Sequence, residues 1–131
     1  MFVCDTHADT LYEMGWQKNP APDVTLSRLA AGGVALQVLA LFTGPKGRLG
    51  DVQAIVAAEL EALDRLLAQG FRQVDDPALA REGAVSIMLS IEGGEVFEEG
   101  LHTVAQWRRR GVDRYRNNAP RVRRSLGARR A

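Results

Sequence analysis

Residues 2–11 read FVCDTHADTL, and the interpretation of the whole chain starts from this stretch. A short apolar run leads directly into a polar cluster around His7 and Asp9. If the run is a strand, its side chains alternate between two faces, so His7 and Asp9 lie on the same face. An imidazole and a carboxylate at the end of a buried strand can share one divalent metal ion. The same spacing also fits a polar loop after an edge strand, with His7 in an ordinary hydrogen bond.

Two further apolar runs are typical of strands in a parallel sheet. Residues 34–42 are apolar apart from Gln37, and residues 84–91 form a second run. Such near-continuous runs belong to sheets that helices cover on both faces, whereas half-exposed strands alternate. Leucine and isoleucine at helical spacing predict a long helix over 52–69, and a last helix is predicted over 95–110. This alternation of strands and helices predicts an α/β fold with a parallel sheet.

Shorter helices are predicted in the connections. Residues 10–15 fit a helical turn, and Thr25 is a suitable N-cap for a brief helix over 26–31. Asp51 is expected to cap the long helix that follows. The connections therefore agree with a fold in which each strand is followed by a helix.

Length and composition indicate one globular domain. The 131 residues fall in the usual size range of a single domain, and 46% hydrophobic with 25% charged residues is ordinary for a soluble protein. No apolar run is long enough for a membrane span, and the N-terminus does not resemble a secretory signal. The one cysteine, Cys4, excludes an internal disulfide and suits a reducing compartment. We therefore expect a cytoplasmic protein in which Cys4 is a small, buried residue of the first strand.

A second polar cluster begins at Glu92, directly after the apolar run 84–91. A carboxylate at the carboxyl end of a buried parallel strand lies where α/β folds place their chemistry. Gly93 and Gly94 let the backbone turn sharply and leave the rim open around Glu92. The alternative is a solvated loop glutamate. Because parallel strands end at the same edge of a sheet, we expect Glu92 to project toward His7 and Asp9.

Together these motifs resemble the membrane dipeptidase (renal dipeptidase) family of zinc peptidases. Residues 5–11, DTHADTL, look like the opening metal motif of that family, and residues 91–95, IEGGE, look like its bridging-carboxylate motif. Residues 29–37, LAAGGVALQ, are similar to the segment that enters its second strand, and the last predicted helix ends in RGV at 110–112. The resemblance covers about residues 3–112 with the motifs in the right order.

The resemblance implies a (β/α)8 TIM-type barrel of the metal-dependent hydrolase superfamily, of which this chain would supply about the first half. Two zinc ions would lie at the C-terminal face of the barrel. His7 and Asp9 would bind the first ion, and Glu92 would bridge both as the catalytic carboxylate. Such a metal pair acidifies water and polarises the scissile carbonyl. The implied activity is zinc-dependent hydrolysis of a dipeptide substrate.

The C-terminal part departs from the family. Two later histidine ligands are needed, but the only other histidine is His102, which matches no family motif. A barrel of this type needs about 250 residues. Residues 113–120, DRYRNNAP, are too charged for the next barrel strand, and Pro120 argues against one. We therefore predict two regions: 1–112 as the N-terminal half of a dipeptidase-like barrel, and 113–131 as a basic, Arg-rich tail that is disordered or non-native.

The charge distribution supports this division. Residues 1–107 contain 7 basic and 15 acidic residues, a net charge of −8, whereas residues 108–131 contain 10 arginines and one aspartate, a net charge of +9. Clustered arginine would give salt-dependent affinity for phosphates, so the alternative function is a small α/β binding module with a nucleic-acid-directed tail. The tail has one aromatic residue, Tyr115, so stacking platforms are not evident. We favour out-of-frame or degraded coding sequence, because the break falls in the middle of the barrel's strand order.

The dipeptidase interpretation predicts a truncated chain that is inactive alone. Three ligands from one half cannot close a two-metal site, so any zinc should bind weakly. The unpaired edges of a half-barrel sheet are expected to promote self-association. Nucleic acid is the less favoured partner.

Overall fold

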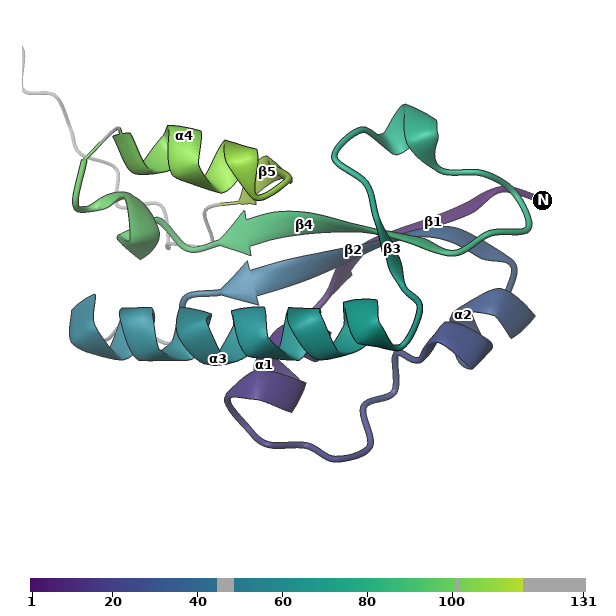
Figure 1. Cartoon of the computed structure of the whole chain (residues 1–131), viewed down its shortest axis with the longest axis horizontal. Coiled ribbons are helices and arrows are strands. Elements are labelled where there is room, and N and C mark those ends of the chain that lie inside the picture. The colour runs from purple at the N-terminus through teal and green to yellow at the C-terminus, as the bar shows by residue number, and fades with distance from the viewer. Residues whose placement is uncertain (45–48, 101, 117–131) are drawn as a thin grey trace, which may run out of the picture.

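A sheet of parallel strands runs through the centre of the structure (Figure 1). The structure is a computed structural model that describes residues 1–44, 49–100 and 102–116. Its strands are β1 (Val3–Ala8), β2 (Val34–Phe42), β3 (Arg72–Gln73), β4 (Ser86–Glu92) and β5 (Val112–Arg116). β2 lies between β1 and β4, and every pairing between these strands is parallel. Both β3 and β5 lie along the other edge of β4, β3 beside its start and β5 beside its end.

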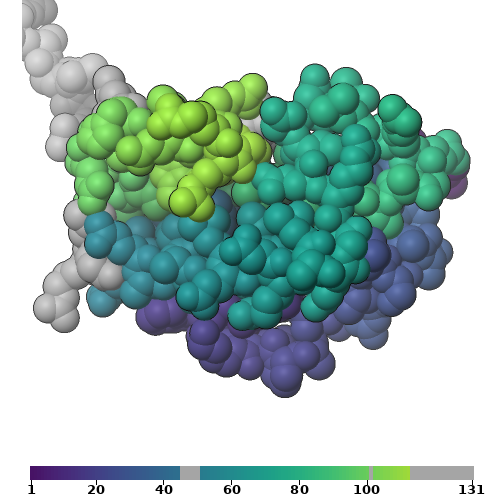
Figure 2. All heavy atoms as spheres, viewed as in Figure 1, coloured from purple at the N-terminus to yellow at the C-terminus, as the bar shows by residue number. Residues whose placement is uncertain are grey.

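The helices follow the strands in the predicted order. They are α1 (Thr10–Gly15), α2 (Leu26–Ala31), α3 (Leu49–Ala68) and α4 (His102–Arg109), with two short 3₁₀ helices, η1 (Pro77–Leu79) and η2 (Glu95–Phe97). In the space-filling view α3 covers the middle of the visible surface, with residues of α1 and the segment after it along its lower border and α4 above it (Figure 2). The predictions of α1 and α2 are confirmed, and the hydroxyl of Thr25 accepts the N–H of Arg28 as the expected cap.

Two helix predictions need correction. The long helix begins at Leu49, so Asp51 lies inside its first turn instead of capping it. The last helix, predicted over 95–110, is divided into η2 and α4. Gly100 lies between these two helices with a φ of +123°, a backbone conformation that cannot continue a right-handed helix.

Alternate residues of β2 and β4 face different layers. On one side, which we call the helix face, strand residues pack with α1, α2 and α3 in the larger core cluster, which includes Leu11, Leu39, Leu63, Leu89 and Ile91. On the other side, which we call the opposite face, strand residues pack with the segment that follows β3 in a smaller cluster that includes Leu36, Val38, Val74 and Met88. Both faces are therefore buried, as the near-continuous apolar runs predicted.

The expectation that no strand follows Val112 is wrong. β5 pairs in parallel with β4 from Val112 to Arg116, so the predicted boundary at residue 112 falls at the start of a strand. β5 pairs only with β4 among the described strands. A strand at the edge of a sheet tolerates charged residues that a central strand would exclude, which explains why the charge of this segment misled the prediction. The remainder of the predicted tail, residues 117–131, lies outside the described residues.

Cys4 is exposed, so its predicted burial in the first strand is also wrong. β1 pairs only with β2 among the described strands, which leaves one of its edges without cover from the sheet. An exposed thiol binds soft metal ions, so metal-binding experiments need a variant that lacks it. Within the described ranges, no helix combines the length and apolar character that crossing a membrane requires.

Candidate metal centre

A shift in the register of β1 determines where His7 points. The ladder has two irregular points: between Val3 and Cys4 the extra residue is in β2, and between Asp5 and Ala8 it is in β1. From the Cys4–Leu36 pair to the Ala8–Leu39 pair, β1 therefore uses one residue more than β2. This extra residue is a β-bulge, which reverses the alternation of side chains beyond it. Ala8 thereby shares the helix face with Leu39, and its neighbour His7 lies on the opposite face. A ladder continued regularly from the Cys4–Leu36 pair would place His7 opposite Leu39 and bury the imidazole under the helices.

Asp5 and Asp9 flank His7 and make different contacts with it: Asp5 with its backbone N–H, and Asp9 with its imidazole. The backbone N–H of His7 donates to Oδ1 of Asp5 at 3.1 Å, which satisfies this donor at the irregular point of β1. The prediction that Asp9 continues the strand is wrong, because Asp9 occupies the N-cap position of α1. Its side chain makes no capping hydrogen bond, and Oδ1 lies 3.2 Å from Nε2 of His7. The two side chains therefore meet across a strand-to-helix turn and not along one pleat.

The position of α1, and with it Asp9, depends on a close approach to α3. A Cβ atom at Gly15 would lie 2.4 Å from the carbonyl oxygen of Ala58. Since real Cβ atoms do not approach backbone oxygens so closely, only glycine lets the end of α1 pack against α3 at this distance. Tyr12 adds an edge-to-face contact with Phe42, with ring centroids 5.0 Å apart, which joins α1 to the end of β2.

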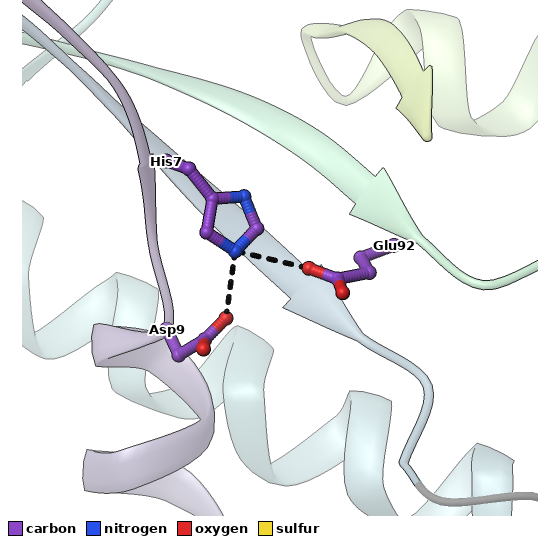
Figure 3. A group of neighbouring side chains, drawn as sticks. All are labelled: His7, Asp9 and Glu92. Carbon is purple, nitrogen blue, oxygen red and sulfur yellow. Dashed lines mark hydrogen bonds and ion pairs between the residues drawn. The ribbon is translucent and has the colours of Figure 1, made fainter. Parts of the chain in front are cut away.

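Glu92 completes the cluster from the other side of β2. It is the last residue of β4, it pairs with Phe42, and its Oε2 lies 3.0 Å from Nε2 of His7. Figure 3 shows the imidazole of His7 pointing at the carboxylates of Asp9 and Glu92 through the same ring nitrogen. One ligand atom from each residue lies within 4.8 Å of the other two. The structure thus brings together the three residues that the sequence singled out, and their role as ligands stays a prediction.

The geometry fits a divalent metal ion. Nε2 of His7 can carry one hydrogen, yet two carboxylate oxygens lie at hydrogen-bonding distance from it. Ligands that share one zinc ion at 2.0–2.2 Å in a tetrahedral shell are about 3.4 Å apart, close to the 3.2 and 3.0 Å between Nε2 of His7 and the two carboxylate oxygens. One imidazole nitrogen with carboxylate oxygens is a donor set that zinc accepts. The exposed fractions of the three side chains are 31% for His7, 50% for Asp9 and 10% for Glu92, so solvent reaches the site.

His102 does not join this cluster. It is exposed at the start of α4. Among the described residues, His7, Asp9 and Glu92 are the one group of three or more potential ligands close enough to hold an ion.

Sequence reasoning missed Glu59, a buried acid beside the site. Glu59 lies in α3 with no exposed surface, and its Oε1 accepts the backbone N–H of Phe42 at 2.8 Å. Burial raises the pKa of this carboxyl to about 8; the hydrogen bond from Phe42 opposes the shift, and the negative charge of Asp9 adds to it. A signal was available, because Glu59 lies four residues from both Ile55 and Leu63, on the apolar stripe of the helix.

Comparisons with known proteins support the fold. No protein-family model matches the chain, and no curated protein matches it. Among solved structures, the dipeptidase AC, a metallo peptidase, matches with a TM-score of 0.67 and 20% identity over 88% of this chain and 42% of its own. A metallo peptidase from Rhodobacter sphaeroides, liganded with a phosphinate mimic of the dipeptide L-Ala-D-Ala, matches with a TM-score of 0.64 and 18% identity.

The second match covers 86% of this chain and 44% of the Rhodobacter sphaeroides protein. This chain therefore spans less than half the length of either structure. The prediction of an α/β fold that forms part of a TIM-type barrel is confirmed. At these identities the likeness concerns the fold, and the chemistry has to be argued from the site itself.

Proposed function

We propose that His7, Asp9 and Glu92 form the first part of a zinc site of the kind used by dipeptidases, in a hydrolase that cleaves dipeptides. One observation carries the proposal: a single nitrogen of His7 faces oxygens of Asp9 and Glu92 at 3.2 and 3.0 Å, at the carboxyl ends of parallel strands. The fold match to two metallo peptidases, one of them liganded with a dipeptide mimic, supports it.

Each residue has a distinct part in the proposal. His7 would bind the ion through Nε2, and Asp9, the most exposed of the three, would hold it from the solvent side. Glu92, the least exposed, would be the catalytic carboxylate, and its two oxygens suit a bridging ligand between two ions. When bound, zinc would supply a Lewis acid that polarises a peptide carbonyl and acidifies water.

We further propose that this chain alone has little or no dipeptidase activity. Three side chains can hold one zinc ion and leave part of its coordination shell open, so they cannot complete a site for two ions. No described histidine other than His7 joins the cluster. The nucleic-acid alternative depends on the basic tail, 108–131, of which 117–131 lie outside the described residues. No observation on the described part favours it. A cytoplasmic location also stays a proposal.

Zinc titration of the chain carrying Cys4→Ser tests the proposal. Removal of the exposed thiol eliminates an adventitious ligand, so the remaining zinc binding reports the candidate site. We expect saturable binding of zinc at one site, with weak affinity and easy exchange, and no appreciable hydrolysis of L-Ala-D-Ala. Absence of saturable binding would contradict the zinc proposal. Robust zinc-dependent hydrolysis that Glu92→Ala abolishes would contradict the proposed inactivity.

Self-association through the sheet edges is a further part of the proposal. Among the described strands, β1 and β5 each pair with one neighbour, so each leaves backbone donors and acceptors on its outer side. Sedimentation velocity over a range of protein concentrations should show species larger than the monomer. A chain that stays monomeric and unfolds in one sharp denaturant transition would contradict this part of the proposal.

A further inference from the structure

Thr43, the residue that follows β2, ties the end of β4 in place. Its backbone N–H donates to the carbonyl oxygen of Glu92 at 3.0 Å, which extends the ladder beyond the end of β2. Its Oγ1 lies 3.2 Å from the same carbonyl oxygen and 2.6 Å from Oε2 of Glu95. Thr43 is buried, so these contacts are shielded from competition with water.

The backbone between Glu92 and Glu95 is shaped around this hydroxyl. A Cβ atom at Gly93 would lie 1.8 Å from Oγ1 of Thr43, and Gly93 has a φ of +114°. Glycine therefore serves two needs here, because it allows both the turn and the approach of the hydroxyl. Glu95 follows in η2, and Oε2 of its carboxylate accepts the hydroxyl of Thr43.

The neighbouring residue anchors the same chain segment to the helix layer. The N–H of Phe42 donates to Glu59 in α3, and the next N–H, that of Thr43, donates to Glu92 in β4. The end of β2 is thus held between α3 and the strand that carries Glu92. Because the carbonyl of Glu92 is fixed, the position from which its side chain reaches His7 is also fixed.

We propose that Thr43, supported by Glu95, is a positioning residue that sets the separation between the carboxylate of Glu92 and the imidazole of His7. The inference rests on the proposed zinc function. In it, the hydroxyl of Thr43 affects the affinity for zinc by holding Glu92, and does not bind the metal itself. Groups that orient ligands in this way typically change metal affinity by about 10- to 100-fold when they are removed.

The test compares Thr43→Val, which keeps the shape and removes the hydroxyl, with Thr43→Ser, which keeps the hydroxyl. Thr103→Val is the matched control. Thr103 lies in α4, is also buried, and donates its hydroxyl to the backbone carbonyl of Gly100 at 2.7 Å. Zinc affinity is measured by competition with a chromophoric chelator in the Cys4→Ser background. We expect Thr43→Val to weaken zinc binding by about 10-fold or more, and Thr43→Ser and Thr103→Val to bind like the parent.

Two outcomes separate this inference from the proposed function. If the parent binds zinc and Thr43→Val binds it equally well, the positioning role is wrong and the zinc site stands. If the parent binds no zinc, NMR of the metal-free chain tests the positioning role through the imidazole resonances of His7. A change in Thr43→Val that is absent from Thr43→Ser and Thr103→Val supports the positioning role, and unchanged resonances overturn it.

A second pair of variants covers the case in which Thr43→Val does not fold. Glu95→Ala removes the partner of the Thr43 hydroxyl, whereas Glu98→Ala removes an exposed carboxylate from the same segment. Both variants change the net charge equally, and Glu95→Gln loses the same charge at the same place while it keeps an oxygen that can accept the hydroxyl. Glu95→Gln therefore separates the contact from the local charge, and it should bind zinc more tightly than Glu95→Ala. We expect weaker binding in Glu95→Ala alone, and equal affinities would overturn the inference.

Discussion

Replacing Glu59 by glutamine is expected to raise the free energy of unfolding at pH 9 by up to about 5 kcal/mol. The carboxyl of Glu59 has a pKa of about 8 in the folded chain against an ordinary value of 4.5, because burial disfavours its charged form. The folded state therefore binds more protons than the unfolded state between these pH values. The stability that the neutral carboxyl provides is fully present below pH 4.5 and is lost progressively as pH rises to about 8.

Glutamine removes the ionisation and keeps an oxygen that can accept the N–H of Phe42. Stability of Glu59→Gln should therefore show no loss attributable to this position between pH 4.5 and 8, and the difference from the parent should grow with pH. Urea unfolding at several pH values measures this. Glu61→Gln, an exposed change two residues away on the same helix, is the matched control. A difference that does not vary with pH would mean that Glu59 does not titrate as burial requires.

Replacing His7 by alanine is expected to weaken zinc binding by more than about 100-fold. Nε2 of His7 is the one nitrogen donor of the cluster in the described part of the chain, and Asp9 and Glu92 both approach it. Without the imidazole, two carboxylates on separate elements remain, and they would hold an ion only as a loose, solvated pair. Chelator competition in the Cys4→Ser background measures the loss.

His102→Ala is the control for this experiment. His102 is exposed in α4 and lies outside the cluster, so its removal should leave zinc affinity unchanged. Equal losses in the two variants would show that zinc binds histidine side chains without selection by the fold. Retained affinity in His7→Ala would place the ion elsewhere and remove the basis of the proposed function.

The central strands of the fold could be predicted from the sequence because their signal is local. Residues 34–42 are apolar on both faces, which only a strand covered by two layers allows, and the observed β2 has these bounds. β5 could not be recognised in the same way, because it lies beside one neighbour at the edge and its stability depends on β4. The two-residue strand β3 is too short to give any periodic pattern.

The site residues could be named from the sequence, but their geometry could not. The positions of Asp9 and Glu92 after apolar runs indicated that they would meet at one edge of the sheet. The reasoning for His7 assumed a regular strand through Asp9, whereas the observed contact depends on a bulge and a helix N-terminus. Thr43 was missed because its contact with Glu92 joins residues remote in sequence. For Glu59 the apolar stripe of α3 indicated burial, but not the partner, the N–H of Phe42.

The pairing register of β1 is part of the site's specification, beside the identity of its residues. Two sequences could carry the same histidine and carboxylates at the same spacing and still differ in whether the strand between Cys4 and Ala8 is bulged. Without the bulge, the histidine would pair with Leu39, the imidazole would point into the helix layer, and the carboxylates would face each other without it. A sequence alignment would score both chains as sharing the motif. The residue that pairs with Leu39 distinguishes them, so a comparison of such sites has to match strand registers as well as letters.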